Sequence, residues 1–176
     1  MKQKYKLGSK SKRIYNSGIH PDLRTIIDMA LFAAPIDFTL TSGVRTQKEQ
    51  HELWTIGRVY NNASGLPRTN PDSWQKVGNV VTWCDGYRKK SNHQKKDDGF
   101  GHAIDFQCYI PGRPDLSYDK IHMAVLIGSF LSIADSLLMF NEVKHVLRSG
   151  ADWDGDTQYL EPGTFIDLPH LELKKP

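Results

Sequence analysis

The chain has 176 residues, of which 39% are hydrophobic and 24% charged, and its formal net charge is +3. This composition is typical of a globular chain, and the length predicts a single domain that buries a hydrophobic core. Its 2 cysteines exclude a disulfide framework and a thiolate zinc site, so we expect free thiols in a reducing compartment, with one bridge as the alternative.

The basic residues are concentrated before the first acidic residue, Asp22. We therefore divide the chain into a basic N-terminal arm, residues 1–16, and a folded domain, residues 17–176. Such an arm is able to contact nucleic acid or the anionic polymers of a bacterial envelope, and the alternative is a solvated, partly frayed terminus. The chain contains no recognisable nucleic-acid-binding motif, so nucleic acid is not an expected partner. No apolar signal segment follows these lysines, which predicts that the protein stays in the cytoplasm until something releases it.

Clear secondary-structure signals lie in the first third of the domain. Pro21 begins a predicted helix with apolar residues at helical spacing, and Pro35 ends it. Residues 36–40 alternate as a half-buried strand. Thr46 to Glu49 reads as a capping box, which predicts a helix over residues 47–56 that closes at Gly57.

The middle of the chain is mostly polar. We expect loops at residues 60–78 and 87–99, a short strand at 79–83, and a longer strand at 102–108. The apolar run 123–140 has the length of a membrane span, but it contains Asp135 and several serines, so we expect a buried central helix and no membrane insertion.

A strand at 142–147, a loop at 150–163 and a final segment at 165–173 complete the chain. Helices and strands are mixed without a regular βαβ period. The predicted fold is therefore α+β, a small single domain with a central antiparallel sheet flanked by helices.

Three separated residues have the chemistry of one zinc site. His93, Asp105 and His170 together would supply two imidazoles and one carboxylate, and a hydrolytic zinc site needs three protein ligands. His102 lies three positions from Asp105, so the two side chains point to opposite faces of a strand. Taken singly, each of these residues is more often structural or solvated than a ligand.

A further carboxylate lies close to the last of these residues. Asp167 is three residues before His170, and Pro169 between them bends the strand away from a regular ladder. A carboxylate beside activated water accepts its proton and passes it to the leaving amine, a role that we assign to Asp167. The alternative is that Asp167 only caps a turn, and that Arg45 is an ordinary surface cation.

The residue patterns of these segments resemble the motifs of a known protein family. The motifs are Ser42-Gly43-Val44-Arg45-Thr46, Lys90-Ser91-Asn92-His93, Gly101-x-Ala103-x-Asp105-Phe106, and Asp167-Leu168-Pro169-His170-Leu171-Glu172-Leu173, in that order. They are similar to the VanY-like and L-alanyl-D-glutamate peptidases of family M15. The resemblance covers residues 17–173 and is closest to phage endolysins of this family.

The resemblance implies a function and a site. It implies a zinc-dependent endolysin that cleaves the L-alanyl-D-glutamate bond of the peptidoglycan stem peptide, with a Hedgehog/DD-peptidase-like fold. By that likeness His93, Asp105 and His170 hold Zn²⁺, Asp167 is the general acid/base, and Arg45 faces the substrate. The expected protein is a monomer that accumulates in the host cytoplasm and reaches the cell wall during lysis.

One departure from the family pattern keeps alternatives open. His93 and Asp105 are separated by about five more residues than in the family, because residues 94–100 intervene, and this keeps His102 as a substitute ligand. The inserted Asp97-Asp98 pair is a candidate for binding a second cation or covering the cleft, or it is a solvated excursion. Alternative functions are a D-alanyl-D-alanine carboxypeptidase of the same fold and a non-catalytic zinc-bearing module that binds cell walls.

Overall fold

The computed structural model describes residues 3–156 and 165–175. Its helices are α1 (Ser9–Tyr15), α2 (Pro21–Ala33), α3 (Gln47–Thr55) and α4 (Lys120–Met139). Its strands are β1 (Asp37–Ser42), β2 (Arg58–Tyr60), β3 (Trp74–Lys76), β4 (Ala103–Tyr109), β5 (Val146–Gly150) and β6 (Asp167–Lys174). Short 3-10 helices occupy η1 (Asn62–Ser64), η2 (Pro71–Ser73) and η3 (Pro114–Leu116).

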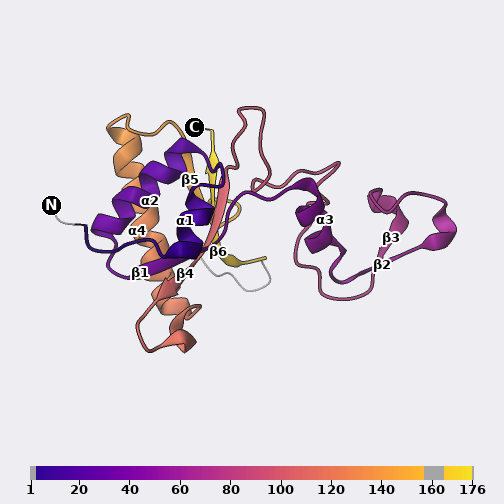
Figure 1. Cartoon of the computed structure of the whole chain (residues 1–176), viewed down its shortest axis with the longest axis horizontal. Coiled ribbons are helices and arrows are strands. Elements are labelled where there is room, and N and C mark those ends of the chain that lie inside the picture. The colour runs from indigo at the N-terminus through magenta and orange to yellow at the C-terminus, as the bar shows by residue number, and fades with distance from the viewer. Residues whose placement is uncertain (1–2, 157–164, 176) are drawn as a thin grey trace.

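A four-stranded antiparallel sheet with the order β1-β4-β6-β5 forms the centre of the molecule, which confirms the predicted α+β class. Figure 1 shows α1, α2 and α4 on one side of this sheet, and the segment that carries α3, β2 and β3 extending away from the other side. Alternate residues of β4, Ile104, Phe106 and Cys108, belong to the hydrophobic core together with apolar residues of α2 and α4. The intervening residues, including Asp105, therefore face away from that core.

The apolar run in the second half of the chain forms α4, as predicted. Among the described residues, α4 is the helix that has the length and hydropathy of a membrane span. Its residues Met123, Leu126, Ile127 and Phe130 are buried in the core, and the Phe130 ring contacts Phe38 and Phe106. The hydropathy of this helix is thus explained by its packing between α2 and the sheet.

The basic N-terminal segment is folded onto the domain as far as it is described. The backbone amides of Lys4 and Tyr5 donate to the carbonyl of Leu31 in α2, at 3.1 and 2.9 Å. Ser11, in α1, is buried and accepts a hydrogen bond from the amide of Leu40 in β1. These contacts argue against a frayed terminus, whereas the boundary at residue 16 and binding of a polyanion stay predictions.

The capping box of α3 is confirmed. The Thr46 hydroxyl accepts from the amide of Glu49 at 3.2 Å, and the Glu49 carboxylate accepts from the amide of Thr46 at 2.7 Å. Gly57 ends the helix with φ +75°, and a Cβ at this position would meet the carbonyl oxygen of Asn79 at 2.2 Å. Only glycine fits this turn.

Some predicted boundaries are wrong. No strand forms at residues 79–83, which run as irregular chain against Gly57, and the predicted loop 60–78 contains β3, which pairs with β2. The strand predicted at 142–147 lies instead at Val146–Gly150, because the amide of Glu142 closes the end of α4 and the amides of Lys144 and His145 donate to Asp22 rather than to a neighbouring strand. The loop predicted for 150–163 falls partly outside the described residues.

Candidate metal centre

The register of the sheet brings two of the three predicted ligands, Asp105 and His170, together. Asp105 in β4 and His170 in β6 are direct partners across the antiparallel pair. Such partners have Cβ atoms about 5 Å apart, on the same face of the sheet. His93 comes from the loop before β4, and its Nε2 lies 3.2 Å from Oδ1 of Asp105 and 3.2 Å from Nδ1 of His170. The third side of this triangle, from His170 Nδ1 to Asp105 Oδ1, is 3.1 Å.

The orientation of the His93 ring is set by the backbone of the loop after β1. His93 is 2% exposed, and its Nδ1 donates to the carbonyl oxygen of Gly43 at 2.7 Å. The amide of Arg45 in turn donates to the carbonyl of His93 at 2.9 Å. Because Nδ1 carries the proton, the lone pair of His93 is on Nε2, which faces the other two residues.

His170 is oriented in the same way by a carboxylate. Its Nε2 lies 3.2 Å from Oε2 of Glu172, which is able only to accept, so Nε2 carries a proton and Nδ1 is directed at Asp105. Both imidazoles thus present a ring nitrogen to the same point and hold the other nitrogen with a hydrogen-bond acceptor. This pairing of ligand and acceptor is usual for metal-binding histidines.

Glu172 belongs to the candidate site, although no sequence pattern singled it out. It is 4% exposed, and its Oε1 accepts from Nε of Arg148 at 3.0 Å and also from Nη2, while its Oε2 accepts from Nδ2 of Asn92 at 2.5 Å. The signal was present in the sequence, because His170 and Glu172 are two apart and therefore share one face of a strand. What the sequence did not give is the burial of that face.

Burial and hydrogen bonding shift the pKa of each group in the centre. Burial lowers the pKa of His93. Burial also opposes ionisation of Asp105, but its contacts with His170, His93 and Arg45 outweigh burial and hold the pKa of this carboxyl far below its ordinary value. For His170 burial is again outweighed, and its hydrogen bonds to Asp105 and Glu172 raise the pKa to about 9.

Arg45 lies at the edge of the triangle. Its Nη2 is 2.5 Å from Oδ2 of Asp105, the carboxylate oxygen that does not face the histidines. Its Nε donates to the hydroxyl of Ser42 and its Nη1 to Oε1 of Gln50, which lies in α3. The guanidinium therefore orients Asp105 as well as lining the cleft.

The three residues lie in a cleft of about 560 Å³ that Asp167 also lines. Burial raises the pKa of Asp167, in part offset by the charge of His170. The ring of Trp153 lies 5.2 Å from that of His170, and Lys89 and Lys90 contribute positive charge to the lining. The cleft thus combines an acceptor triangle, a carboxylate with a raised pKa, and cations.

His102 does not join this cluster. Its Nε2 lies 2.6 Å from Oδ2 of Asp98, and its ring packs against His20 and His145. The opposite-face argument from strand geometry is therefore confirmed, and His93 is the histidine that lies beside Asp105.

The donor set fits zinc. Bonds of about 2.0–2.1 Å in a tetrahedral arrangement place ligand atoms roughly 3.3 Å apart, close to the spacing of the three atoms described above. The set consists of two imidazoles, which bind metals in their neutral form, and one carboxylate. This combination suits Zn²⁺ better than Ca²⁺ or Mg²⁺. His93, Asp105 and His170 would therefore hold the ion and leave a fourth position toward the cleft.

An antiparallel sheet carries this cluster in a cleft, beside a carboxylate with a raised pKa, and this arrangement is suited to metal-assisted hydrolysis. The sequence is 29% identical over 164 residues to the peptidoglycan L-alanyl-D-glutamate endopeptidase CwlK of Bacillus subtilis strain 168, covering 89% of this chain and 74% of that protein. The L-Ala D-Glu endopeptidase ChiX of Serratia marcescens has a similar structure, with a TM-score of 0.59 and 20% identity, covering 97% of this chain and 91% of that one. No family model matches. The two comparisons confirm the predicted resemblance to the M15-like peptidases; closeness to phage enzymes stays a prediction.

Proposed function

We propose that this protein is a zinc-dependent peptidoglycan hydrolase that cleaves the L-alanyl-D-glutamate bond of the stem peptide. The observation that carries the proposal is the triangle of His93 Nε2, Asp105 Oδ1 and His170 Nδ1, with edges of 3.1 to 3.2 Å, in the lining of a cleft. The choice of substrate rests on the named activity of CwlK, which aligns with most of this chain.

The residues of the cleft have separate tasks in this reaction. When bound, zinc would supply Lewis-acid chemistry, which lowers the pKa of water and polarises a carbonyl group. The carboxylate of Asp167 would take the proton of the attacking water and donate it to the nitrogen of the leaving D-glutamate. The guanidinium of Arg45 would stabilise the negative charge that develops on the scissile carbonyl oxygen, while it keeps Asp105 in place.

The charge of the cleft also matches the proposed substrate. D-Glutamate has two carboxyl groups, and at most one of them is used in the next peptide bond, so a negative charge lies beside the bond to be cut. Lys89 and Lys90 line the cleft and are suited to attract it. Arg148 also lines the cleft, but it is held by Glu172.

The decisive experiment is a digest of purified peptidoglycan followed by mass analysis of the released fragments. The expected products are stem peptides with a new amino terminus on D-glutamate. Release of free D-alanine without these fragments would instead establish a carboxypeptidase, and an absence of any product from zinc-loaded protein would establish a binding module.

The Asp167→Asn variant tests the mechanism separately from the fold. We expect it to lose at least about 100-fold in rate while keeping its zinc and its melting temperature, because the amide accepts no proton. The matched control is Asp135→Asn, an exposed position on α4 that should leave the rate unchanged. Parent-like activity of Asp167→Asn would remove this residue from the mechanism.

The proposal also includes a biological setting, which concerns the origin, oligomeric state and location of the protein. A monomeric phage endolysin would collect in the host cytoplasm and act on the wall when the membrane is opened. It rests on the sequence-based expectation that the motifs resemble those of phage endolysins. Light scattering on the purified protein tests the monomer, and lysis of producing cells only after membrane permeabilisation tests the location.

A further inference from the structure

An exposed tryptophan lies on the rim of the cleft that holds the metal centre. Val81, Thr82, Trp83 and Cys84, which we call the rim segment, all line this cleft. Trp83 is 56% exposed and Val81 is 49% exposed, whereas tryptophan is on average one of the more buried residue types. An exposed apolar surface that continues into a cleft is typical of a binding site.

The backbone on both sides of Trp83 is held by one buried side chain. Gln50 in α3 is 0% exposed, and its Nε2 donates to the hydroxyl of Thr82 at 3.3 Å and to the carbonyl of Cys84 at 3.0 Å. The amide of Cys84 also donates to the hydroxyl of Thr82, at 3.2 Å. The carbonyl of Thr82 accepts from Nη2 of Arg58 at 3.2 Å. Because its two neighbours are fixed in this way, the position of Trp83 is set before any ligand binds.

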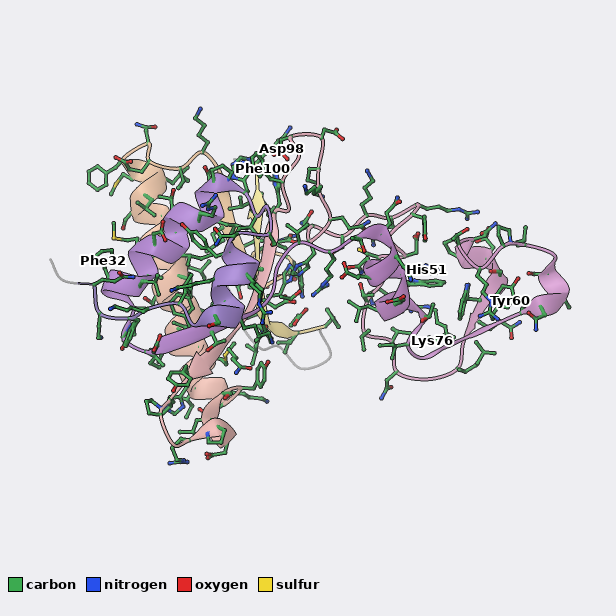
Figure 2. The ribbon with its side chains drawn as sticks, in the orientation of Figure 1. Phe32, His51, Tyr60, Lys76, Asp98 and Phe100 are labelled. Atoms are coloured by element: carbon green, nitrogen blue, oxygen red, sulfur yellow. The ribbon has the colours of Figure 1, made fainter. Side chains whose placement is uncertain are left out.

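The indole of Trp83 is steadied by the extension that carries α3, β2 and β3. Cζ of Arg58 in β2 lies 4.3 Å from the ring centroid of the buried Trp54 and 5.7 Å from that of Trp83. Nζ of Lys76 in β3 lies 5.5 Å from the Trp83 centroid. Figure 2 shows His51 on the side of α3 that faces this strand pair, and the His51 ring stacks on Trp54 at 5.4 Å. Trp83 is therefore a firmly mounted aromatic surface, which loses little conformational entropy when a ligand binds.

Gln50 also links the rim segment to the metal centre. Its Oε1 accepts from Nη1 of Arg45 at 3.4 Å, and Nη2 of Arg45 contacts Oδ2 of Asp105. Two planar side-chain groups and their hydrogen bonds thus separate the rim segment from Asp105, a span on the order of 10 Å. A ligand that occupies the metal centre with one part is therefore able to reach Trp83 with another.

The proposed substrate has a sugar at about that distance. In peptidoglycan the amino group of L-alanine is joined by a lactyl group to N-acetylmuramic acid of the glycan strand. L-Alanine and the lactyl group together span roughly 7 Å when extended, since each is about as long as one residue. The broad faces of a pyranose ring carry C–H groups, and an exposed indole is suited to pack against them. The sugar next to a stem peptide bound for cleavage thus falls within the range of the rim segment.

We propose that Trp83, with Val81 of the same segment, forms a subsite for the glycan strand that stacks on the muramic acid ring next to the scissile stem peptide. The inference rests on the proposed function and deepens it, because it names the part of the substrate that the rim of the cleft recognises. It also assigns a direction to the substrate, with the L-alanyl side toward the rim segment. A peptidase with this subsite prefers stem peptides that are still attached to glycan.

The test compares two soluble substrates that share one stem peptide. The first carries the disaccharide of N-acetylglucosamine and N-acetylmuramic acid on L-alanine, and the second carries an acetyl group in its place. We expect the parent to cleave the first with a kcat/KM at least about tenfold higher. Trp83→Ala should lose most of this preference, and Trp83→Phe should retain part of it. The matched control is Val59→Ala, which should keep the full preference, because Val59 is also 56% exposed on the same extension but is not part of the cleft lining.

Binding of the sugar alone is measured without cleavage. The indole N–H signal of Trp83 in the NMR spectrum of the full-length protein is identified by its loss in Trp83→Phe. We expect the free disaccharide to shift this signal, and polyglycerol phosphate, an anionic wall polymer, to leave it in place. A shift caused by the polymer and not by the disaccharide would assign the surface to anionic polymers and overturn the sugar subsite.

The outcomes separate this inference from the proposed function. Equal kcat/KM of the parent for the two substrates, or a preference that Trp83→Ala keeps, would overturn the subsite and leave the proposed peptidase intact. If the parent cleaves neither substrate, the proposed function fails, and the NMR signal then decides: a shift by the disaccharide supports a sugar site at Trp83, and an unshifted signal overturns it.

Discussion

Replacing Glu172 by glutamine tests how the metal centre holds His170. The two carboxylate oxygens of Glu172 accept from donors on both sides: Arg148 at Oε1, and Asn92 and His170 at Oε2. Glutamine has the same shape but only one acceptor oxygen. In either orientation its NH₂ group points at a donor, because every neighbour of Glu172 that forms these bonds is itself a donor.

The size of the effect follows from these contacts. If the amide oxygen stays with Arg148, the hydrogen bonds to Asn92 and His170 are lost, and a hydrogen bond to a charged group contributes about 1.5 kcal/mol or more. We therefore expect Glu172→Gln to lower the free energy of unfolding of the metal-free protein by roughly 3 kcal/mol. Because the His170 ring loses its acceptor, zinc affinity should fall by about 10–100-fold.

The pH dependence of this difference has a defined sign. Burial alone would raise the pKa of Glu172, but hydrogen bonds from His170, Arg148 and Asn92 lower it from 4.5 to about 2. A lowered pKa means that Glu172 stabilises the folded state fully above pH 4.5, and that this contribution is lost as the pH falls toward 2. The difference in free energy of unfolding between parent and variant should therefore be largest near neutral pH and should decrease below pH 4.5.

The assays are urea denaturation of the metal-free proteins and competition for zinc against a chelator. The control is Glu142→Gln, an exposed position that should match the parent in both assays. If Glu172→Gln unfolds within 0.5 kcal/mol of the parent, about the scatter expected of surface substitutions, and binds zinc equally well, the account of how His170 is oriented is refuted.

Three further predictions concern other parts of the molecule. Burial raises the pKa of Asp167, so activity should fall as the pH drops through a value above that of an ordinary aspartate; a kcat/KM profile checks this, and a profile without that acid limb contradicts it. Arg45→Lys should lower kcat about tenfold or more, since one ammonium cannot bind Ser42, Gln50 and Asp105 together; steady-state kinetics at unchanged zinc content measure it, and a parent-like kcat argues against the role. Phe130→Ala should cost about 3–5 kcal/mol of stability in denaturant, whereas the exposed Phe140→Ala should cost little; equal losses would mean that α4 is not packed as described.

Local signals in the sequence were enough to predict several elements. The capping box at Thr46 and the prolines at 21 and 35 fixed the limits of helices, because caps and proline act within one turn of chain. The period of two along β4 correctly separated His102 from Asp105. The strand prediction for residues 79–83 was wrong, because it rested only on strand-like composition and these residues form no strand.

The candidate site was predicted as a set of residue types and not as a geometry. His93, Asp105, His170 and Asp167 were named from their chemistry and from the resemblance to M15 peptidases, and the structure brings all of them to one cleft. Glu172, which holds His170, was missed because its importance depends on burial between Arg148 and Asn92. No local pattern reports the burial of a charged residue.

The sequence by itself predicted the helices α2, α3 and α4, the alternation of faces along β1 and β4, and the side chains that are able to bind zinc, because these depend on near neighbours in the chain. Only the tertiary structure decided that Asp105 faces His170 across the sheet and that the inserted loop places Asp98 beside His20 and His102. Strand register and loop packing arise from contacts between residues far apart in the chain, and their energies exist only when the whole core has formed.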